Sequence, residues 1–171
     1  MHWDIRQARF EDARSLVELA ARIYYETFAE FNTPENMQAY LSSSFTLAQF
    51  QSELRDPRAA FYLAQAEKEF AGYAKLQAGK PPECVTGANP IELVRLYVDR
   101  RWQGQGLARA LLDRCLIDAK HQGYKTIYLG VWEHNERAIA FYRKWNFVRV
   151  GDHIFQMGDD PQTDWWMMRS L

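Results

Sequence analysis

The chain has 171 residues, a formal net charge of −1, and 47% apolar and 25% charged residues. This length fits one domain, residues 1–171, with enough apolar residues to bury a core. Because the net charge is close to zero, we expect no nucleic-acid partner. The chain has no apolar run long enough for a transmembrane helix or a signal peptide, so we expect no membrane association and a cytoplasmic location. The spacing of Cys84 and Cys115 supports neither a disulfide nor a metal site.

Helical spacing and β-type runs divide the first half of the chain. Thr33 is a predicted N-cap, because Pro34 follows it at a favoured first helical position. Thr46 is predicted to cap the next helix in the same way. The predicted elements are a strand at 3–8, helices at 12–28, 34–44 and 47–54, and a strand hairpin at 59–66 and 70–77.

The second half alternates strands and helices. Asn135 is a predicted N-cap, and the apolar stripe of Ala138, Phe141, Tyr142 and Trp145 indicates the helix after it. The predicted elements are a loop at 79–90, strands at 93–98 and 126–131, helices at 107–119 and 136–145, and closing strands at 147–157 and 163–169 around a turn at 158–161. The predicted class is α+β, with a mixed central sheet flanked by helices.

Two glycines, Gly104 and Gly106, lie between a predicted strand and the helix after it. Free N–H groups at a helix start, approached through glycine, suit a pyrophosphate, and Arg101 and Arg109 flank the loop. A tight strand-to-helix turn is the alternative, and the spacing alone leaves both open. The pattern lacks the lysine of a P-loop and the third glycine of a dinucleotide fingerprint.

Two motifs give this loop a family context. Residues 101–106, RWQGQG, resemble the R/Q-x-x-G-x-G/A signature of GCN5-related N-acetyltransferases, and residues 135–142, NERAIAFY, resemble the second motif of that family, N-x-x-A-x-x-x-Y. The order of elements is also similar over most of the chain. The resemblance implies a mostly antiparallel sheet with a strand splay at the acetyl-CoA site, and direct acetyl transfer from acetyl-CoA to an amine. Asn146 stands where the family usually has glycine, and asparagine best replaces glycine in a left-handed helix cap.

The resemblance also implies roles for individual residues. Tyr142 would be the general acid that protonates the leaving thiolate, with packing in the apolar stripe as the alternative. Glu92 would be the base, with a surface carboxylate, ion-paired to Arg95, as the alternative. The residues implied to bind acetyl-CoA are Leu96, Tyr97, Val98, Gln103, Gly104, Gln105, Gly106, Leu107, Ala108, Arg109, Asn135 and Tyr142.

The acceptor is predicted to bind to the first half of the chain. Residues 25–28 and 32–37 are similar to a polyamine acetyltransferase subgroup typified by bacterial PaiA, which acts on spermidine or spermine. Glu26, Glu30 and Glu35 would attract such a polycation, and solvated carboxylates are the equal alternative. Three functions stay open: acetylation of a small amine, acetylation of a protein N-terminus or lysine, and non-catalytic acyl-CoA sensing. Such folds are often homodimers.

Overall fold

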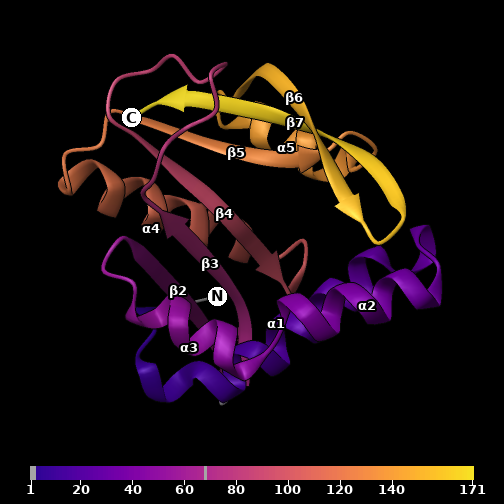
Figure 1. Ribbon diagram of the computed structural model, residues 1–171. Coiled ribbons are helices and arrows are strands. Elements are labelled where there is room, and N and C mark those ends of the chain that lie inside the picture. Colours follow the sequence, from indigo (N-terminus) through magenta and orange to yellow (C-terminus); the bar gives the residue numbers. More distant parts are fainter. Residues whose placement is uncertain (1–2, 68) are drawn as a thin grey trace.

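The computed structural model describes residues 3–67 and 69–171. A seven-stranded sheet runs through it in the order β1-β2-β3-β4-β5-β7-β6 (Figure 1). The strands are β1 (Asp4–Gln7), β2 (Ala59–Ala66), β3 (Glu69–Gln77), β4 (Pro90–Val98), β5 (Thr126–Trp132), β6 (Val148–Met157) and β7 (Asp160–Ser170). The helices are α1 (Ala13–Phe28), α2 (Pro34–Ser44), α3 (Leu47–Arg55), α4 (Leu107–His121) and α5 (Glu136–Lys144), with short 3-10 turns η1 (Phe10–Asp12), η2 (Ala29–Phe31) and η3 (Arg100–Trp102).

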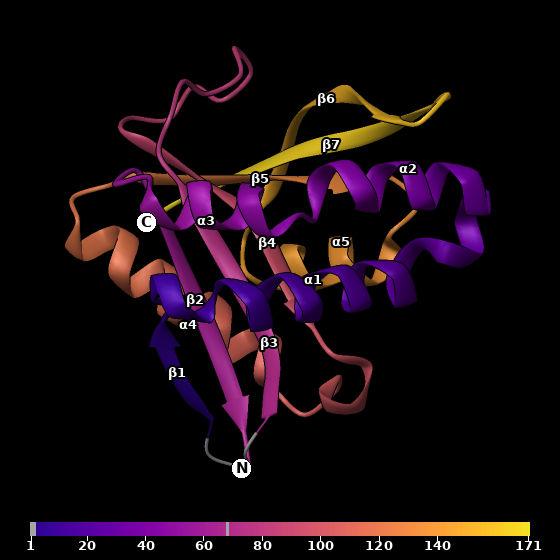
Figure 2. The same ribbon diagram turned by 60° about the horizontal axis from the view of Figure 1, so that its bottom comes forward.

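Helices cover both faces of the sheet. α1 and α3 lie on one face and α4 lies behind the other, as the rotated view shows (Figure 2). Leu16 and Ile23 of α1 and Phe50 of α3 pack against Phe61 of β2. A second core joins α4 and α5 to the opposite face of the strands. All strand pairs are antiparallel except β4 with β5, so the predicted mixed, mostly antiparallel α+β architecture is confirmed.

The predicted helix starts are confirmed at the level of single hydrogen bonds. The side-chain oxygens of Thr33, Thr46 and Asn135 accept from the backbone N–H groups of Asn36, Gln49 and Ala138, respectively. Each of these bonds pairs an N–H group that the helix itself leaves free. Local side-chain chemistry therefore sets where α2, α3 and α5 begin.

Two strands are longer than the sequence predicts. β4 begins at Pro90, inside the predicted loop, where it pairs with Thr126 of β5. Proline is tolerated there because the first residue of a strand needs no N–H in the ladder. β7 begins at Asp160, so the predicted four-residue turn is a two-residue hairpin turn. Pro161 fits because β5 pairs with β7 only from Asp164 onward, in the part of the chain that the structure describes.

The end of α5 has a Schellman motif centred on Asn146. Its φ is +63°, in the left-handed region. The N–H of Phe147 donates to the carbonyl of Tyr142 at 3.1 Å, and the N–H of Asn146 donates to that of Arg143 at 3.0 Å. The substitution of asparagine for the usual glycine therefore preserves the cap, and the cap holds the backbone of Tyr142.

Replacing Asn146 tests this cap. Asn146→Ala should destabilise the protein by about 1 kcal/mol, because a Cβ without a compensating side-chain hydrogen bond is unfavourable at positive φ. Asn146→Gly is the matched control and should be as stable as the original chain or more so. Urea unfolding measures both. Equal stability of the alanine and glycine variants would show that the left-handed conformation is not required.

Candidate active site

The centre of the candidate site is the point where β4 and β5 separate. These parallel strands pair only from Pro90 to Glu92, within the described residues, although both continue beyond that point. On its other side β4 stays paired with β3 as far as Val98. Residues 93–98 therefore present a strand edge without a strand neighbour, which is the predicted splay. Such an edge suits an extended ligand with amide groups.

The glycine loop follows directly from the end of β4. Gly104 and Gly106 have φ values of +77° and +90°, and a Cβ at either would meet nothing within 4 Å. The glycines are thus required by backbone conformation and not by a close neighbour. In the described chain, no hydrogen bond uses the backbone N–H groups of residues 104–109. These free donors converge at the start of α4, where the helix dipole also favours an anion.

The arginines near this loop differ in their availability. Arg101 is bound to Asp99 and Glu69, and Arg109 lies 3.8 Å from Asp113. The two cations that the sequence singled out are therefore engaged elsewhere. Arg100 and Arg137 instead line the cavity beside the loop.

The loop is anchored by Asp99, which is 1% exposed. Its carboxylate contacts Arg22 of α1 at 2.6 Å and Arg101 at 3.2 Å, and it accepts from the N–H of Arg101 at 2.9 Å. Burial opposes ionisation, but the hydrogen bonds from Arg101 and Arg22 lower the pKa of Asp99 to about 2. Asp99 thus stays charged at neutral pH and fixes the loop to α1.

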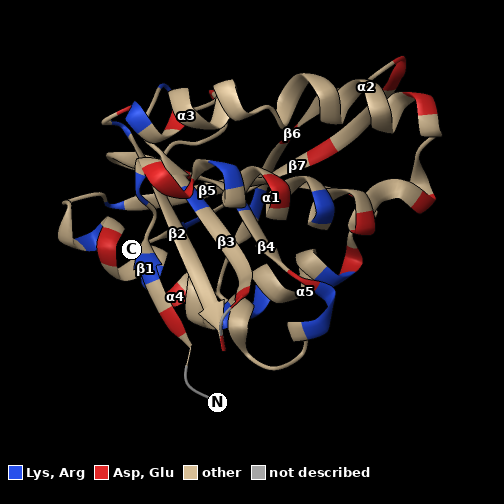
Figure 3. Ribbon diagram, turned by 90° about the horizontal axis from the view of Figure 1, so that it is seen from below, with Lys and Arg blue, Asp and Glu red and all other residues tan. Residues whose placement is uncertain are grey.

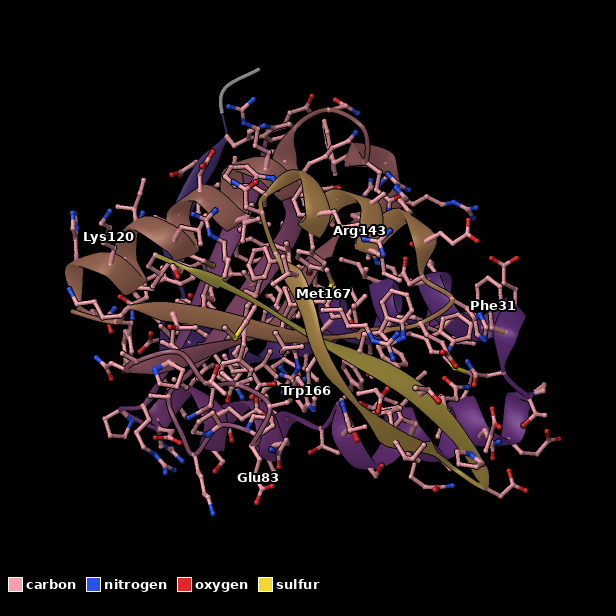
Figure 4. The ribbon with its side chains drawn as sticks, turned by 90° about the horizontal axis from the view of Figure 1, so that it is seen from above. Phe31, Glu83, Lys120, Arg143, Trp166 and Met167 are labelled. Atoms are coloured by element: carbon pink, nitrogen blue, oxygen red, sulfur yellow. The ribbon has the colours of Figure 1, made fainter. Side chains whose placement is uncertain are left out.

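Two neighbouring cavities open on the splay. The outer cavity, about 540 Å³, is lined by residues of α1, η2, β4 and α5, including Gln103, Arg100 and Arg137. The inner cavity, about 290 Å³, lies between α1–α2 and the face of β5, β7 and β6. The two cavities share one wall: Phe28, Leu96, Tyr97, Trp132, Asn135 and Ala138. Seen from above, Trp166 of the inner cavity lies near the centre of the molecule and Phe31 of the outer cavity lies at its edge (Figure 4).

The structure brings several predicted residues together at these cavities. Leu96, Tyr97 and Asn135 line both, and Val98 and Gln103 line the outer one. The carbonyl of Val98 accepts from the Gln103 side chain at 3.0 Å, so this group of the strand edge is already paired. The predicted loop residues 104–109 lie next to Gln103, beyond the lining of the outer cavity.

The predicted acid and base both line the inner cavity. Tyr142 is 9% exposed, and burial raises the pKa of its hydroxyl above the ordinary value. The phenol is therefore protonated at neutral pH and able to donate. Burial also raises the pKa of Glu92, partly offset by Lys75 and the Tyr128 hydroxyl. The alternative pairing of Glu92 with Arg95 is not found, because Arg95 binds Glu53 at 2.8 Å.

The carboxylates predicted to attract the acceptor are separated. Glu26 and Glu30 line the outer cavity, whereas Glu35 is exposed at the start of α2, outside the lining of both cavities. Acidic residues mark the later turns of α1 and the turn into α2, and basic residues mark α5 (Figure 3).

Sequence reasoning missed Asp164 and His153, which line the inner cavity. Their surroundings come from strands that are distant in the sequence, so no local pattern marks them as cavity residues.

Comparison with known proteins gives this site a family. The model of the acetyltransferase (GNAT) family matches residues 15–147. An uncharacterised N-acetyltransferase of Lactobacillus delbrueckii subsp. lactis is 29% identical over 167 residues, which cover 98% of this chain and 96% of the relative. The crystal structure of the PaiA N-acetyltransferase of Thermoplasma acidophilum with coenzyme A superposes with a TM-score of 0.78 at 21% identity, over 100% of both chains. The crystal structure of the ribosomal-protein-S18-alanine N-acetyltransferase of Escherichia coli superposes with a TM-score of 0.74 at 19% identity. The superposition covers 99% of this chain and 94% of the other.

The chain belongs to the GNAT family of N-acetyltransferases, and acetyl-CoA is its co-substrate. The residues present fit this co-substrate, because free N–H groups at 104–109 suit a pyrophosphate and the open edge of β4 suits a pantetheine arm. Among the described residues, no helix is long and apolar enough to cross a membrane.

Gly106→Ala tests the anion-binding loop. The positive φ of Gly106 is unfavourable for alanine by roughly 1–2 kcal/mol, so the start of α4 should shift and re-orient its N–H groups. We expect acetyl-CoA affinity to fall about tenfold, measured by calorimetry. Gly79→Ala is the control, since Gly79 has open space around it and no positive φ. Unchanged affinity in Gly106→Ala would exclude the loop from binding.

Proposed function

We propose that this protein acetylates a small-molecule amine, with a polyamine such as spermidine as the favoured acceptor. The observation that carries the proposal is the closure of the inner cavity. The β6–β7 hairpin reaches across to α2 and the turn before it (Figure 1). Gln162 donates to Asn32 at 2.7 Å, and Asn36 donates to Asp159 at 2.8 Å.

Aromatic packing strengthens this closure. Tyr40 of α2 contacts Phe155 of β6, with ring centroids 5.5 Å apart. Tyr24 of α1 packs on Tyr40 at 5.0 Å and lies against Met157 of β6. A peptide acceptor would need an open groove where these residues meet. A volume of about 290 Å³ instead suits a small ligand.

Two carboxylates of the outer cavity favour a cationic acceptor. Glu26 and Glu30 lie on the wall of the outer cavity, at its α1 and η2 side. Carboxylates at the wall of a cleft raise the local concentration of a cation. Arg100 and Arg137 line the same cavity beside the glycine loop, so the side formed by Glu26 and Glu30 is the part that supports a polyamine over a neutral amine.

The chemistry assigns one proton transfer to each of two side chains. Acetyl-CoA supplies the acetyl thioester. Glu92 accepts the proton of the acceptor ammonium, directly or through water, so that the nitrogen lone pair can attack. The new N–C bond forms as the C–S bond breaks, and Tyr142 donates its proton to the departing sulfur. The nitrogen then loses its second proton, which returns to the oxygen of Tyr142 and leaves the neutral amide. Asn135 caps α5 through its side-chain oxygen, which leaves its amide nitrogen free to face both cavities.

An amine panel tests the proposed function. The purified protein should release CoA thiol from acetyl-CoA when spermidine is added, and should act much more slowly on peptides with a free N-terminus or lysine. Tyr142→Phe should lower kcat about 10²–10⁴-fold and reduce acetyl-CoA affinity far less. Thiol release with peptides alone would contradict the proposal, and acetyl-CoA binding without any turnover would favour a sensor.

The pH profile tests Glu92 as the base. Only the deprotonated carboxylate accepts a proton, so kcat/KM should rise with pH through the pKa of Glu92, which burial raises above its ordinary value. Glu92→Gln should remove this limb and lower kcat/KM about 10²-fold or more. Glu83→Gln is the control, because Glu83 is exposed and lines neither cavity. If kcat/KM of Glu92→Gln still rose with pH over the same range, the base would be another group.

A further inference from the structure

One face of β7 forms a wall of the inner cavity. Gln162, Asp164 and Trp166 alternate along the strand and all three line it. Asp164 lies opposite Trp132 of β5 and opposite His153 of β6. The ring of His153 stacks on Trp166 with centroids 4.2 Å apart. Among the described residues of this wall, Asp164 is the one carboxylate, and its neighbours are largely aromatic.

Asp164, which is half-buried, differs in its partners from the carboxylates that hold the fold together. Asp99 binds Arg22 and Arg101, and Glu53 binds Lys75 at 3.0 Å and Arg95 at 2.8 Å. Within the described residues, Asp164 has no ion pair and its side chain has no hydrogen bond. Burial, together with the charge of Glu133, raises the pKa of Asp164 to about 6. An uncompensated carboxylate in such a place is a frequent mark of a functional site.

The charges around the inner cavity do not cancel. Arg95 lines it, and Glu53 binds both this guanidinium and the ammonium of Lys75. Burial lowers the pKa of His153, which favours the neutral imidazole at neutral pH. The charge of Lys75 acts on Glu92 and partly offsets the effect of burial on the pKa of that carboxyl, whereas Asp164 has no ion-paired cation in the described structure. Asp164 is therefore the carboxylate of the inner cavity that is free to bind a positive charge of a ligand.

We propose that Asp164 binds a second, non-reacting ammonium group of the acceptor, and that the enzyme thereby selects amines with two nitrogens over monoamines. The inference rests on the proposed function and adds a residue and a rule of selection to it. Glu92 serves the nitrogen that is acetylated, and Asp164 holds the nitrogen that stays charged. The aromatic rings of Trp132, Trp166 and Phe155 would enclose the alkyl chain and contact the ammonium through their faces.

Matched acceptors test this selection. 1,3-Diaminopropane, 1,4-diaminobutane and 1,5-diaminopentane are each compared with the alkylamine in which methyl replaces one amino group. The original chain should prefer at least one diamine, and Asp164→Asn should lower kcat/KM for it about 10- to 100-fold, as expected for loss of a hydrogen bond to a charged group. The rate with the alkylamine and the KM for acetyl-CoA should not change. Asp152→Asn is the control, since this exposed aspartate of β6 lies outside the cavity lining.

Thermal unfolding separates a binding role from a structural one. A carboxylate without a partner destabilises the fold when ionised, so Asp164→Asn should raise Tm at neutral pH, whereas a structural aspartate would lower it. Equal rates of the original chain with diamine and alkylamine, or an equal loss of both in Asp164→Asn, would overturn the inference and leave the proposed function standing. If the protein acetylated peptides but none of the small amines, both the inference and the proposed function would be overturned.

Discussion

The separation of β4 from β5 is the constraint on which the rest of the structure depends. Parallel pairing ends at Glu92, and from that point the two halves of the sheet diverge. The divergence leaves the edge of β4 free and opens the space that both cavities occupy. It also places Glu92 at the base of the opening and the glycine loop at its far end. A continuous ladder between the strands would bury these groups and remove the site.

Charge pairing fixes β4 and the glycine loop to the helices that cover this half of the sheet. Asp99, between β4 and the glycine loop, is bound to α1 through Arg22, and Glu53 of α3 binds Arg95 of β4. Buried carboxylates that have such partners stay ionised at little cost, and breaking one pair would leave an uncompensated charge. On the opposite wall, the β6–β7 hairpin is tied to α2 by amide hydrogen bonds without ion pairs. Asp164 of the inner cavity is thus distinguished from these structural carboxylates, because it has no ion pair among the described residues.

The sequence predicts features that depend on local chemistry. Thr33, Thr46 and Asn135 act within three residues of themselves, and Asn146 needs only its own φ. The two motifs are also enough to identify the family, because they mark the glycine loop and the helix α5 beside the cavities.

Features set by distant contacts were not predictable. Arg101 flanks the glycine loop in the sequence, but Asp99 and Glu69 bind its guanidinium. The Arg22–Asp99 contact joins residues 77 positions apart. Asp164 gains its surroundings from β5, β6 and α2, so no local pattern marks it as a cavity residue.

A crystal structure with CoA and the acetylated diamine tests the central claim most directly. The account predicts that the pyrophosphate accepts hydrogen bonds from the N–H groups of residues 104–109 and that the pantetheine arm follows the edge of β4. The acetamide should lie between Tyr142 and Glu92, with the free ammonium within hydrogen-bond distance of Asp164. A product bound outside the inner cavity, or an ammonium directed away from Asp164, would contradict it.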